Sequence, residues 1–320
     1  MKMINEWLGA GFLPLGIAYG LSLLVLLVGS FTDLKTREVP DWLNYGLIIS
    51  GIGLNMLFSF IYFDQSVIVK DASLNNGTFQ YIISPHSYLM KSIIGLVIFF
   101  GIAYIMFYAG QWGGGDSKII MGLGAMLGLD LSLKHGFMLG FLINALFAGA
   151  VYGLLWSAFL VVKNRKKFWS EFSKALSKKE AAKAKKSIAI ASAALIILFF
   201  AVQSPLLRLT VLSFALLMLA TFYLWIFVKA VEKSCMYKLV EPSKLTEGDW
   251  IVKDIYSNGK YICGPKDLGI EKSQIRRLIE LHKKRKINRI LIKEGIPFVP
   301  SFLIAFVVTL FFGNPLLRIL

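Results

Sequence analysis

Two aspartates, Asp33 and Asp116, are the residues of this 320-residue sequence best suited to chemistry. Asp33 ends one long apolar run and Asp116 precedes another, so both carboxylates are expected at the edge of a membrane. A carboxylate in such a place is costly, and its presence indicates function or pairing. If the two share a site, one keeps a proton while the other acts as a base toward water. That chemistry is sufficient to hydrolyse a peptide bond.

Asp116 directly follows three glycines, Gly113, Gly114 and Gly115. Successive glycines permit backbone conformations and close approaches that other residues forbid. Between two apolar runs, they predict an unwound segment open to cytoplasmic water, where a substrate backbone can lie beside the carboxylate.

Two other interpretations of this segment are weaker. A phosphate cradle is disfavoured because the glycine spacing is not that of a phosphate-binding loop and no strand precedes it. A dyad of Ser117 and Lys118 is disfavoured because neighbouring side chains on a helix diverge.

The surroundings of Asp33 are less distinctive. Lys35 and Arg37 follow the aspartate, and Pro40 precedes the next apolar run, which contains Asn44. An ordinary cytoplasmic hairpin has the same pattern. Asp33 therefore needs a partner before a catalytic role is favoured.

Together the two segments resemble a known family. Residues 113–116 resemble the G-x-G-D signature of the GxGD aspartic proteases, and residues 33–44 are similar to the first-aspartate segment of the prepilin peptidase branch. The resemblance covers roughly residues 10 to 160 and is greatest to the archaeal preflagellin and prepilin peptidases, or class III signal peptidases. Residues 295–300 also resemble the C-terminal region of longer archaeal members.

The resemblance implies an archaeal cell-membrane endopeptidase that removes the short basic leader from type IV pilin-like or archaellin precursors. Asp33 and Asp116 are then the catalytic pair, with no metal and no cofactor. The residues expected to shape the loops or bind substrate are Gly113, Gly114, Gly115, Lys35, Arg37 and Asn44. The bacterial branch's paired CxxC motifs have no counterpart here, so its methyltransferase activity is not expected.

The elements that must position these residues are membrane helices. The sequence is 56% hydrophobic with a mean hydropathy of +0.65, which is too apolar for a water-soluble globule. A spanning helix needs about 20 mostly apolar residues. Eight runs qualify, near residues 10–31, 42–63, 88–110, 117–133, 136–162, 187–203, 206–229 and 297–313. The predicted fold is an all-α polytopic membrane protein of about eight helices.

The net charge of +16 is explained by membrane topology rather than by nucleic acid. Lys and Arg gather in residues 35–37, 163–186 and 229–293, whereas residues 64–87 and 130–135 carry one each. By the positive-inside rule, the basic segments and both aspartates are cytoplasmic, and both termini lie outside.

Five regions are expected along the chain. A membrane-embedded peptidase core (1–162) precedes a basic amphipathic loop (163–186) and two further helices (187–229). A small cytoplasmic α/β module (230–296) leads to the last helix and tail (297–320). In the module, Asn258-Gly259 predicts a β-hairpin. The basic loop is expected to touch anionic lipid, with docking of an acidic partner as the alternative.

Other functions are less favoured. Presenilin-like proteases, which cut within a transmembrane helix, share G-x-G-D but pair it with Tyr-Asp, whereas this chain has Thr32-Asp33. A proton- or ion-coupled transporter would also explain glycine-rich unwinding, but the ionisable residues deep in the membrane are too few. A zinc peptidase is disfavoured because the three histidines show no paired spacing.

Overall fold

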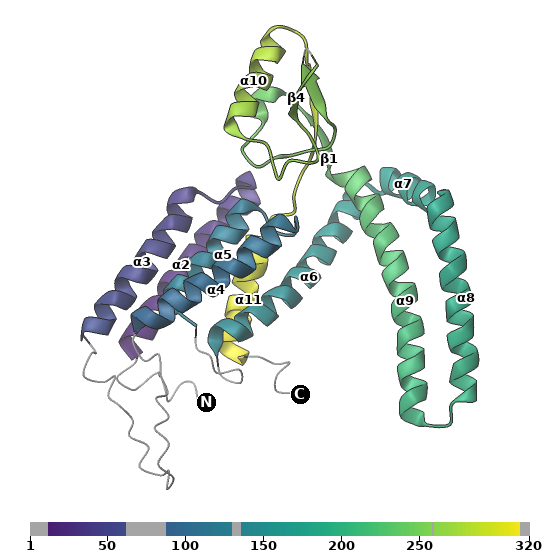
Figure 1. Cartoon of the computed structure of the whole chain (residues 1–320), viewed down its shortest axis with the longest axis horizontal. Helices are drawn as coiled ribbons and strands as arrows, with labels where there is room; N and C mark the ends of the chain where they lie inside the picture. Colours follow the sequence, from purple (N-terminus) through teal and green to yellow (C-terminus); the bar gives the residue numbers. More distant parts are fainter. Residues whose placement is uncertain (1–11, 62–87, 130–135, 258, 314–320) are drawn as a thin grey trace. The chain divides into compact units, whose positions relative to one another are not determined.

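The computed structural model describes residues 12–61, 88–129, 136–257 and 259–313. Most of these residues are helical (Figure 1). The α-helices are α2 (Phe12–Thr36), α3 (Asp41–Ile61), α4 (Tyr88–Tyr108), α5 (Gly114–Leu127), α6 (Phe137–Lys163), α7 (Arg165–Ser177), α8 (Lys179–Ala201), α9 (Pro205–Val231), α10 (Lys272–Lys283) and α11 (Val299–Phe312). The predicted outside segments 64–87 and 130–135, and both chain ends, lie outside the described residues.

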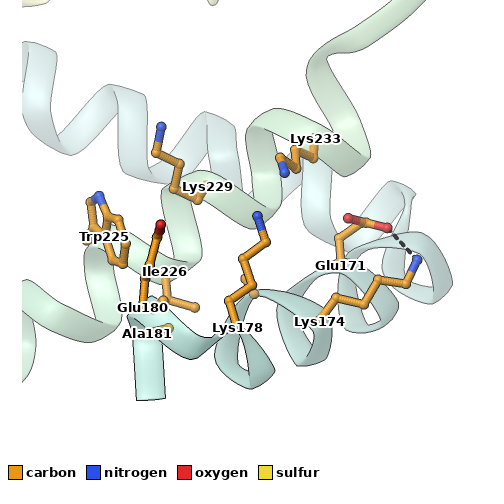
Figure 2. A pocket seen from close by; sticks show the side chains of 10 residues that line it. Glu171, Lys174, Lys178, Glu180, Ala181, Trp225, Ile226, Lys229 and Lys233 are labelled. Atoms are coloured by element: carbon orange, nitrogen blue, oxygen red, sulfur yellow. Dashed lines mark hydrogen bonds and ion pairs between the residues drawn. The ribbon is translucent and has the colours of Figure 1, made fainter. Parts of the chain in front are cut away.

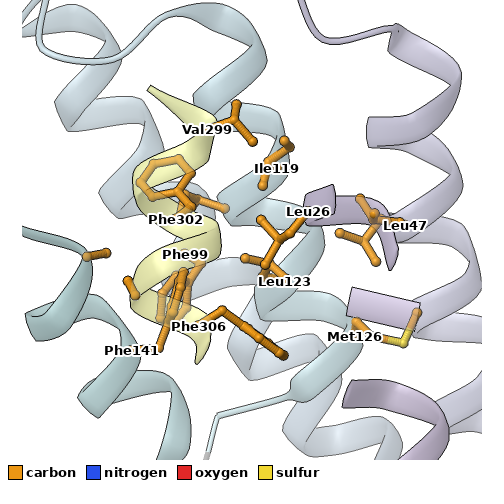
Figure 3. Packing of buried hydrophobic residues seen from close by; sticks show 14 of the residues in the cluster. Leu26, Leu47, Phe99, Ile119, Leu123, Met126, Phe141, Val299, Phe302 and Phe306 are labelled. Atoms are coloured by element: carbon orange, nitrogen blue, oxygen red, sulfur yellow. The ribbon is translucent and has the colours of Figure 1, made fainter. Parts of the chain in front are cut away.

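The chain divides into two compact units, the first formed by residues 1–153 and 296–320. In it α5 packs against α3 and α4, while α11 packs against α2. Figure 3 shows the apolar core where these helices meet, with side chains from α2, α3, α4, α5, α6 and α11. Leu26, Ile119 and Phe302 are fully buried there. Helix α11, more than 100 residues beyond α6 in sequence, is thus part of the same core.

Small residues bring α4 and α5 close together. A Cβ atom added to Gly124 would lie 2.7 Å from the carbonyl oxygen of Gly95 and 2.8 Å from Cβ of Phe99. Only glycine fits at such a separation, as is common where membrane helices pack through their backbones.

Buried polar side chains complete the C-terminal end of α5. Asn55 Nδ2 on α3 donates to the carbonyl oxygens of Ala125 and Met126 at 3.2 and 3.0 Å, and Ser92 Oγ on α4 donates to Ala125 at 2.6 Å. The last carbonyls of a helix have no partner within it, so these bonds remove a cost that is high in an apolar environment.

Six helices are long and apolar enough to cross a membrane: α2, α3, α4, α6, α8 and α9. The chain is therefore a multi-pass membrane protein. The count of eight spans is not confirmed, because α5 and α11 have 14 residues each. At 1.5 Å per residue such a helix is about 21 Å long, against about 30 Å of hydrocarbon.

The two short helices nevertheless run between the two ends of the first unit. After α5, the N–H of Leu129 donates to the carbonyl oxygen of Lys91, in the first turn of α4, at 2.9 Å. After α11, the carbonyl oxygen of Gly313 accepts from Asn144 Nδ2, near the start of α6, at 2.9 Å. Helix α5 is largely buried among longer helices, whereas α11 buries one face and leaves Ile304, Phe311 and Phe312 exposed.

The second unit, residues 154–295, contains α7, α8, α9 and a small α/β module. The segment 163–186 is not one surface helix: it forms α7 and the first two turns of α8. Phe168 is 3% exposed and packs with Phe172 and Phe227, whereas Trp169 is 61% exposed. Much of the apolar face of α7 therefore contacts protein rather than lipid.

The module has its own core and two sheets. Strands β1 (Tyr237–Val240) and β2 (Trp250–Ile251) flank β5 (Ile290–Lys293) in antiparallel pairs, and β3 (Ile255–Ser257) pairs with β4 (Lys260–Cys263). Gly259, between β3 and β4, has φ +75°, as the Asn-Gly hairpin predicts. Helix α10 covers a core that includes Leu278 and Ile290. The small α/β fold expected from the sequence is therefore present.

Candidate active site

Asp33 lies in the last turn of α2 and is held by the chain's final described helix. Its side chain is 6% exposed, and its Oδ2 accepts a hydrogen bond from the backbone N–H of Val299 at 3.0 Å. Val299 is the first residue of α11, so the carboxylate lies at the positive end of that helix dipole. The donor and the dipole both stabilise an ionised carboxylate at this position.

Helix α2 ends at Thr36, three residues after Asp33. The N–H of Arg37 donates to the carbonyl oxygen of Asp33 at 2.9 Å, and Arg37 has φ +62°. A left-handed residue at this position closes a helix and turns the chain away from its axis. Arg37 therefore shapes the connection to α3, and its guanidinium acts electrostatically on Asp33.

Asp116 lies in the first turn of α5, and its Oδ2 accepts a hydrogen bond from the N–H of Gly113 at 2.9 Å. Burial raises the pKa of Asp116 to about 7, and the neighbouring charge of Asp33 acts in the same direction. The two aspartates, 83 positions apart in sequence, are thus close enough to influence each other's ionisation. A carboxyl group with this pKa is a proton donor at neutral pH.

The glycines before Asp116 leave space beside it. Gly113 and Gly114 are exposed, and a Cβ at Gly115 would lie 3.2 Å from the Val39 side chain. Gly113 has φ −72°, which any residue adopts, and α5 already begins at Gly114. The unwound segment is thus shorter than expected, and the absence of side chains explains these glycines better than unusual backbone angles do.

The connection from α2 to α3 is tied to the start of α5. Lys118 Nζ forms an ion pair with Asp41 Oδ1 at 2.5 Å and lies 5.2 Å from the centre of the Tyr45 ring. The hydroxyl of Ser117 instead donates to the carbonyl oxygen of Ala103 at 3.5 Å. Ser117 and Lys118 therefore contact different helices, which argues against a Ser-Lys dyad.

The remaining predicted residues lie in different environments. Lys35 is exposed, with Nζ 6.0 Å from the centre of the Phe31 ring. Asn44 is completely buried, and its side-chain atoms have no hydrogen-bond partner among the described residues. Lys35 is thus accessible at the surface, whereas Asn44 belongs to the interior of the bundle.

Sequence reasoning missed the contribution of α11. Trp112 is 3% exposed and packs edge-on against Phe302, with ring centres 5.5 Å apart, so α11 also supports the segment before the glycines. Pro297 and Pro300 mark the start of a helix in the sequence, but no local pattern relates that start to Asp33. Among the described residues, no group of three His, Cys, Asp or Glu side chains is placed to hold a metal ion.

Part of the chain matches a known family model. Residues 20–154 match the model of the type IV leader peptidase family. Both Asp33 and Asp116 lie within this range. The resemblance seen in the motifs is thereby confirmed for this part of the chain.

Three curated relatives are preflagellin peptidases. The protein of Methanococcus voltae is 37% identical over 111 residues, which cover 35% of this chain and 38% of the relative. Those of Methanocaldococcus jannaschii and Methanococcus maripaludis are each 34% identical, over 32% and 35% of this chain and 34% and 39% of the relatives. The chain thus spans little more than a third of the length of these relatives. No solved structure matches the chain.

Proposed function

From the match of residues 20–154 to the type IV leader peptidase family, we propose that this chain is an aspartic endopeptidase. It removes the short basic leader from type IV pilin-like or archaellin precursors at the cytoplasmic membrane face. The observation that carries this proposal is the electrostatic coupling of Asp33 and Asp116. A pair of interacting carboxyl groups with one proton between them suits peptide hydrolysis.

The surroundings of the two aspartates support different roles. Asp33 accepts the Val299 N–H at the start of α11, which favours the anion that acts as general base. Asp116, with a pKa of about 7, carries the proton that acts as general acid. Water adds to the peptide carbonyl carbon as its proton passes to Asp33. Asp116 protonates the leaving amine as the C–N bond breaks, giving a new carboxyl end and a new amino end.

A precursor with a cytoplasmic leader and an apolar helix suits this site. Its apolar helix lies in the bilayer, where α2, α3 and α4 expose apolar side chains such as Leu27, Ile49 and Ile105. Asp41 already pairs with Lys118, so exposed Glu38 is the carboxylate better placed to attract the leader's positive charges. Exposed Gly113 and Gly114 leave room for the extended backbone at the cleavage position.

The orientation rests on the distribution of charge. The basic segments 35–37, 163–186 and 229–293 face the cytoplasm under the positive-inside rule, and both termini face outside. This arrangement requires the chain to pass eight times between the two sides. The courses of α5 and α11, which end against the starts of α4 and α6, are compatible with that number.

The test is leader processing in cells that co-express this chain with a membrane-anchored archaellin or pilin precursor. Wild type is expected to shorten the precursor at the junction of its basic leader and apolar helix. Asp33→Asn and Asp116→Asn keep the shape of each side chain and are expected to leave the precursor intact. Processing by either variant at the wild-type rate would contradict the proposed pair. Cleavage inside the apolar helix would instead favour a presenilin-like protease.

A further inference from the structure

A cavity of about 330 Å³ lies among α7, the start of α8 and the end of α9 (Figure 2). It belongs entirely to the second unit and contains neither aspartate of the proposed active site. Four lysines and two glutamates line it, a formal charge of 4 − 2 = +2. We propose that this cavity binds the phosphate-bearing headgroup of an anionic phospholipid.

The lysines of the cavity are largely available for a ligand. Lys174 pairs with Glu171 at 2.7 Å, as Figure 2 shows. Within the described part of the chain, Lys178, Lys229 and Lys233 form no ion pair. Three ammonium groups, one between α7 and α8, one on α9 and one just after α9, thus border one cavity without a carboxylate within ion-pair distance. Phosphate oxygens accept hydrogen bonds from such groups and neutralise their charge.

The cavity is lined by more positive than negative side chains despite its two glutamates. The hydrogen bond from Lys174, together with the charges of Lys174, Lys233 and Lys178, lowers the pKa of Glu171. The ionisation of the Glu171 carboxylate is therefore favoured by three separate lysines. An anion placed in the cavity would experience the same attraction.

Packed apolar side chains give the cavity a fixed frame. Ile226 and Ala181, which line it, are 1% and 2% exposed and pack with Phe222. Within α7, Phe168 stacks on Phe172 with ring centres 5.5 Å apart. The lysines thus project from helices whose spacing is set by a core, rather than from an unsupported loop.

The position along the helices favours a lipid over a soluble anion. Trp225 lines the cavity one turn before Lys229 and is 48% exposed, a pairing typical of the boundary between headgroups and hydrocarbon. Farther from the lysines, Leu217 on α9 and Ile190 on α8 are 63% and 72% exposed. An acyl chain can run along these apolar surfaces while the headgroup occupies the basic cavity.

The experiment measures lipid binding by the purified, delipidated full-length chain with native mass spectrometry. The probes are dioleoylphosphatidylglycerol, which is anionic, and dioleoylphosphatidylcholine, which is zwitterionic. Wild type is expected to bind the anionic lipid about tenfold or more tightly. Equal binding of the two lipids by wild type would overturn the proposal without any variant.

Two double variants that remove the same charge identify the site. Lys229→Gln with Lys233→Gln is expected to abolish most of the preference for the anionic lipid. Lys183→Gln with Lys185→Gln, at exposed positions on α8 outside the cavity, is the matched control and is expected to keep it. Equal losses in both would indicate diffuse electrostatic attraction and contradict a discrete site. The double variant Lys229→Arg with Lys233→Arg keeps the charge and is expected to retain the wild-type preference for the anionic lipid.

A competition experiment distinguishes the source of the phosphate. Inorganic phosphate, compared with chloride at equal ionic strength, is expected to leave the bound anionic lipid in place. Displacement of the lipid by inorganic phosphate would overturn the lipid assignment in favour of a soluble anion. The measurement uses no precursor, so its outcome is independent of the proposed peptidase activity.

Discussion

Asp33 and Asp116 are chemically identical side chains in unlike surroundings. Asp33 accepts a backbone N–H at the start of α11, a helix that follows it by 266 positions. Asp116 accepts from Gly113, and burial raises its pKa to about 7. In the proposed mechanism, environment rather than residue type therefore determines which of the two gives and which takes a proton.

The pKa of Asp116 makes the proposed activity depend on pH. With Asp116 as the proposed general acid, kcat/KM for the proposed leader cleavage should fall as pH rises through about 7. The sign follows from the raised pKa: the acid is present below that value and lost above it. Rates measured from pH 5 to pH 9 with a purified precursor check this. A rate that stays constant up to pH 9 would exclude Asp116 as the general acid.

The Val299 N–H is predicted to position Asp33 and stabilise its charge. An amide-to-ester replacement at residue 299, introduced as the hydroxy-acid analogue of valine, removes this donor and keeps the side chain. The expected loss in kcat is about ten- to one-hundredfold, because a hydrogen bond to a charged group contributes about 1.5–3 kcal/mol. KM should change far less than kcat.

The ester is introduced by nonsense suppression at codon 299. The control is valine inserted at the same codon by the same method. Its activity should equal that of wild type. The acidic limb of the pH profile should move upward in the ester variant, because the anion of Asp33 has lost a donor. An ester variant with unchanged kcat and pH profile would show that α11 does not act on Asp33.

At the scale of elements, the site depends on the close packing of α5. This helix carries Asp116, and its position is set by contacts with α3 and α4 along its length. The Gly95–Gly124 contact and the bonds from Asn55 and Ser92 fix its far end. A change at that end should therefore reach the aspartate through a displacement of the whole helix.

Gly95→Ala is predicted to destabilise the first unit by about 1–3 kcal/mol, because overpacking at a tight contact forces the backbones apart. A Cβ at Gly95 would overlap the carbonyl oxygen of Gly124. Gly101→Ala on the same helix is the matched control, since a Cβ there meets no atom within 4 Å. Thermal unfolding in detergent should show a lower midpoint for Gly95→Ala alone. Equal midpoints would contradict the described spacing of α4 and α5.

At the scale of the whole molecule, the α/β module between α9 and α11 is separable from the chemistry. It has its own core, and none of the predicted site residues belongs to it. Strands β1 and β5 pair antiparallel, and the N–H of Glu294 donates to the carbonyl oxygen of Met236 at 2.9 Å. The chain thus enters and leaves the module at nearly the same point.

Replacement of residues 237–293 by a short Gly-Ser linker is predicted to preserve leader cleavage within about twofold, since the linker needs to span only an antiparallel pair. Processing in cells and the amount of membrane-inserted protein measure the result. Loss of cleavage at normal protein levels would assign the module a part in substrate binding or catalysis. The Asp116→Asn variant of the shortened chain provides the inactive control.

Much of the arrangement follows from local sequence patterns. Apolar length predicts every long helix, because burial in a bilayer needs an uninterrupted run of such residues. Gly113, Gly114 and Gly115 single out Asp116 in the sequence as a candidate, because glycines leave space beside its carboxylate. The Asn-Gly pair predicts the β3–β4 hairpin, because residue 259 takes a positive φ that favours glycine.

Other features depend on contacts between distant segments, which no local pattern encodes. Only the folded bundle brings Val299 to Asp33, and only the structure shows that α5 and α11 are 14 residues long where the sequence predicted full spans. The same holds for the basic cavity, whose lysines come from separate helices. The sequence by itself determined which residues could do chemistry, through their types and immediate neighbours. The tertiary structure decided how Asp33 and Asp116 differ, because a carboxyl group's ionisation depends on every donor, charge and apolar surface around it.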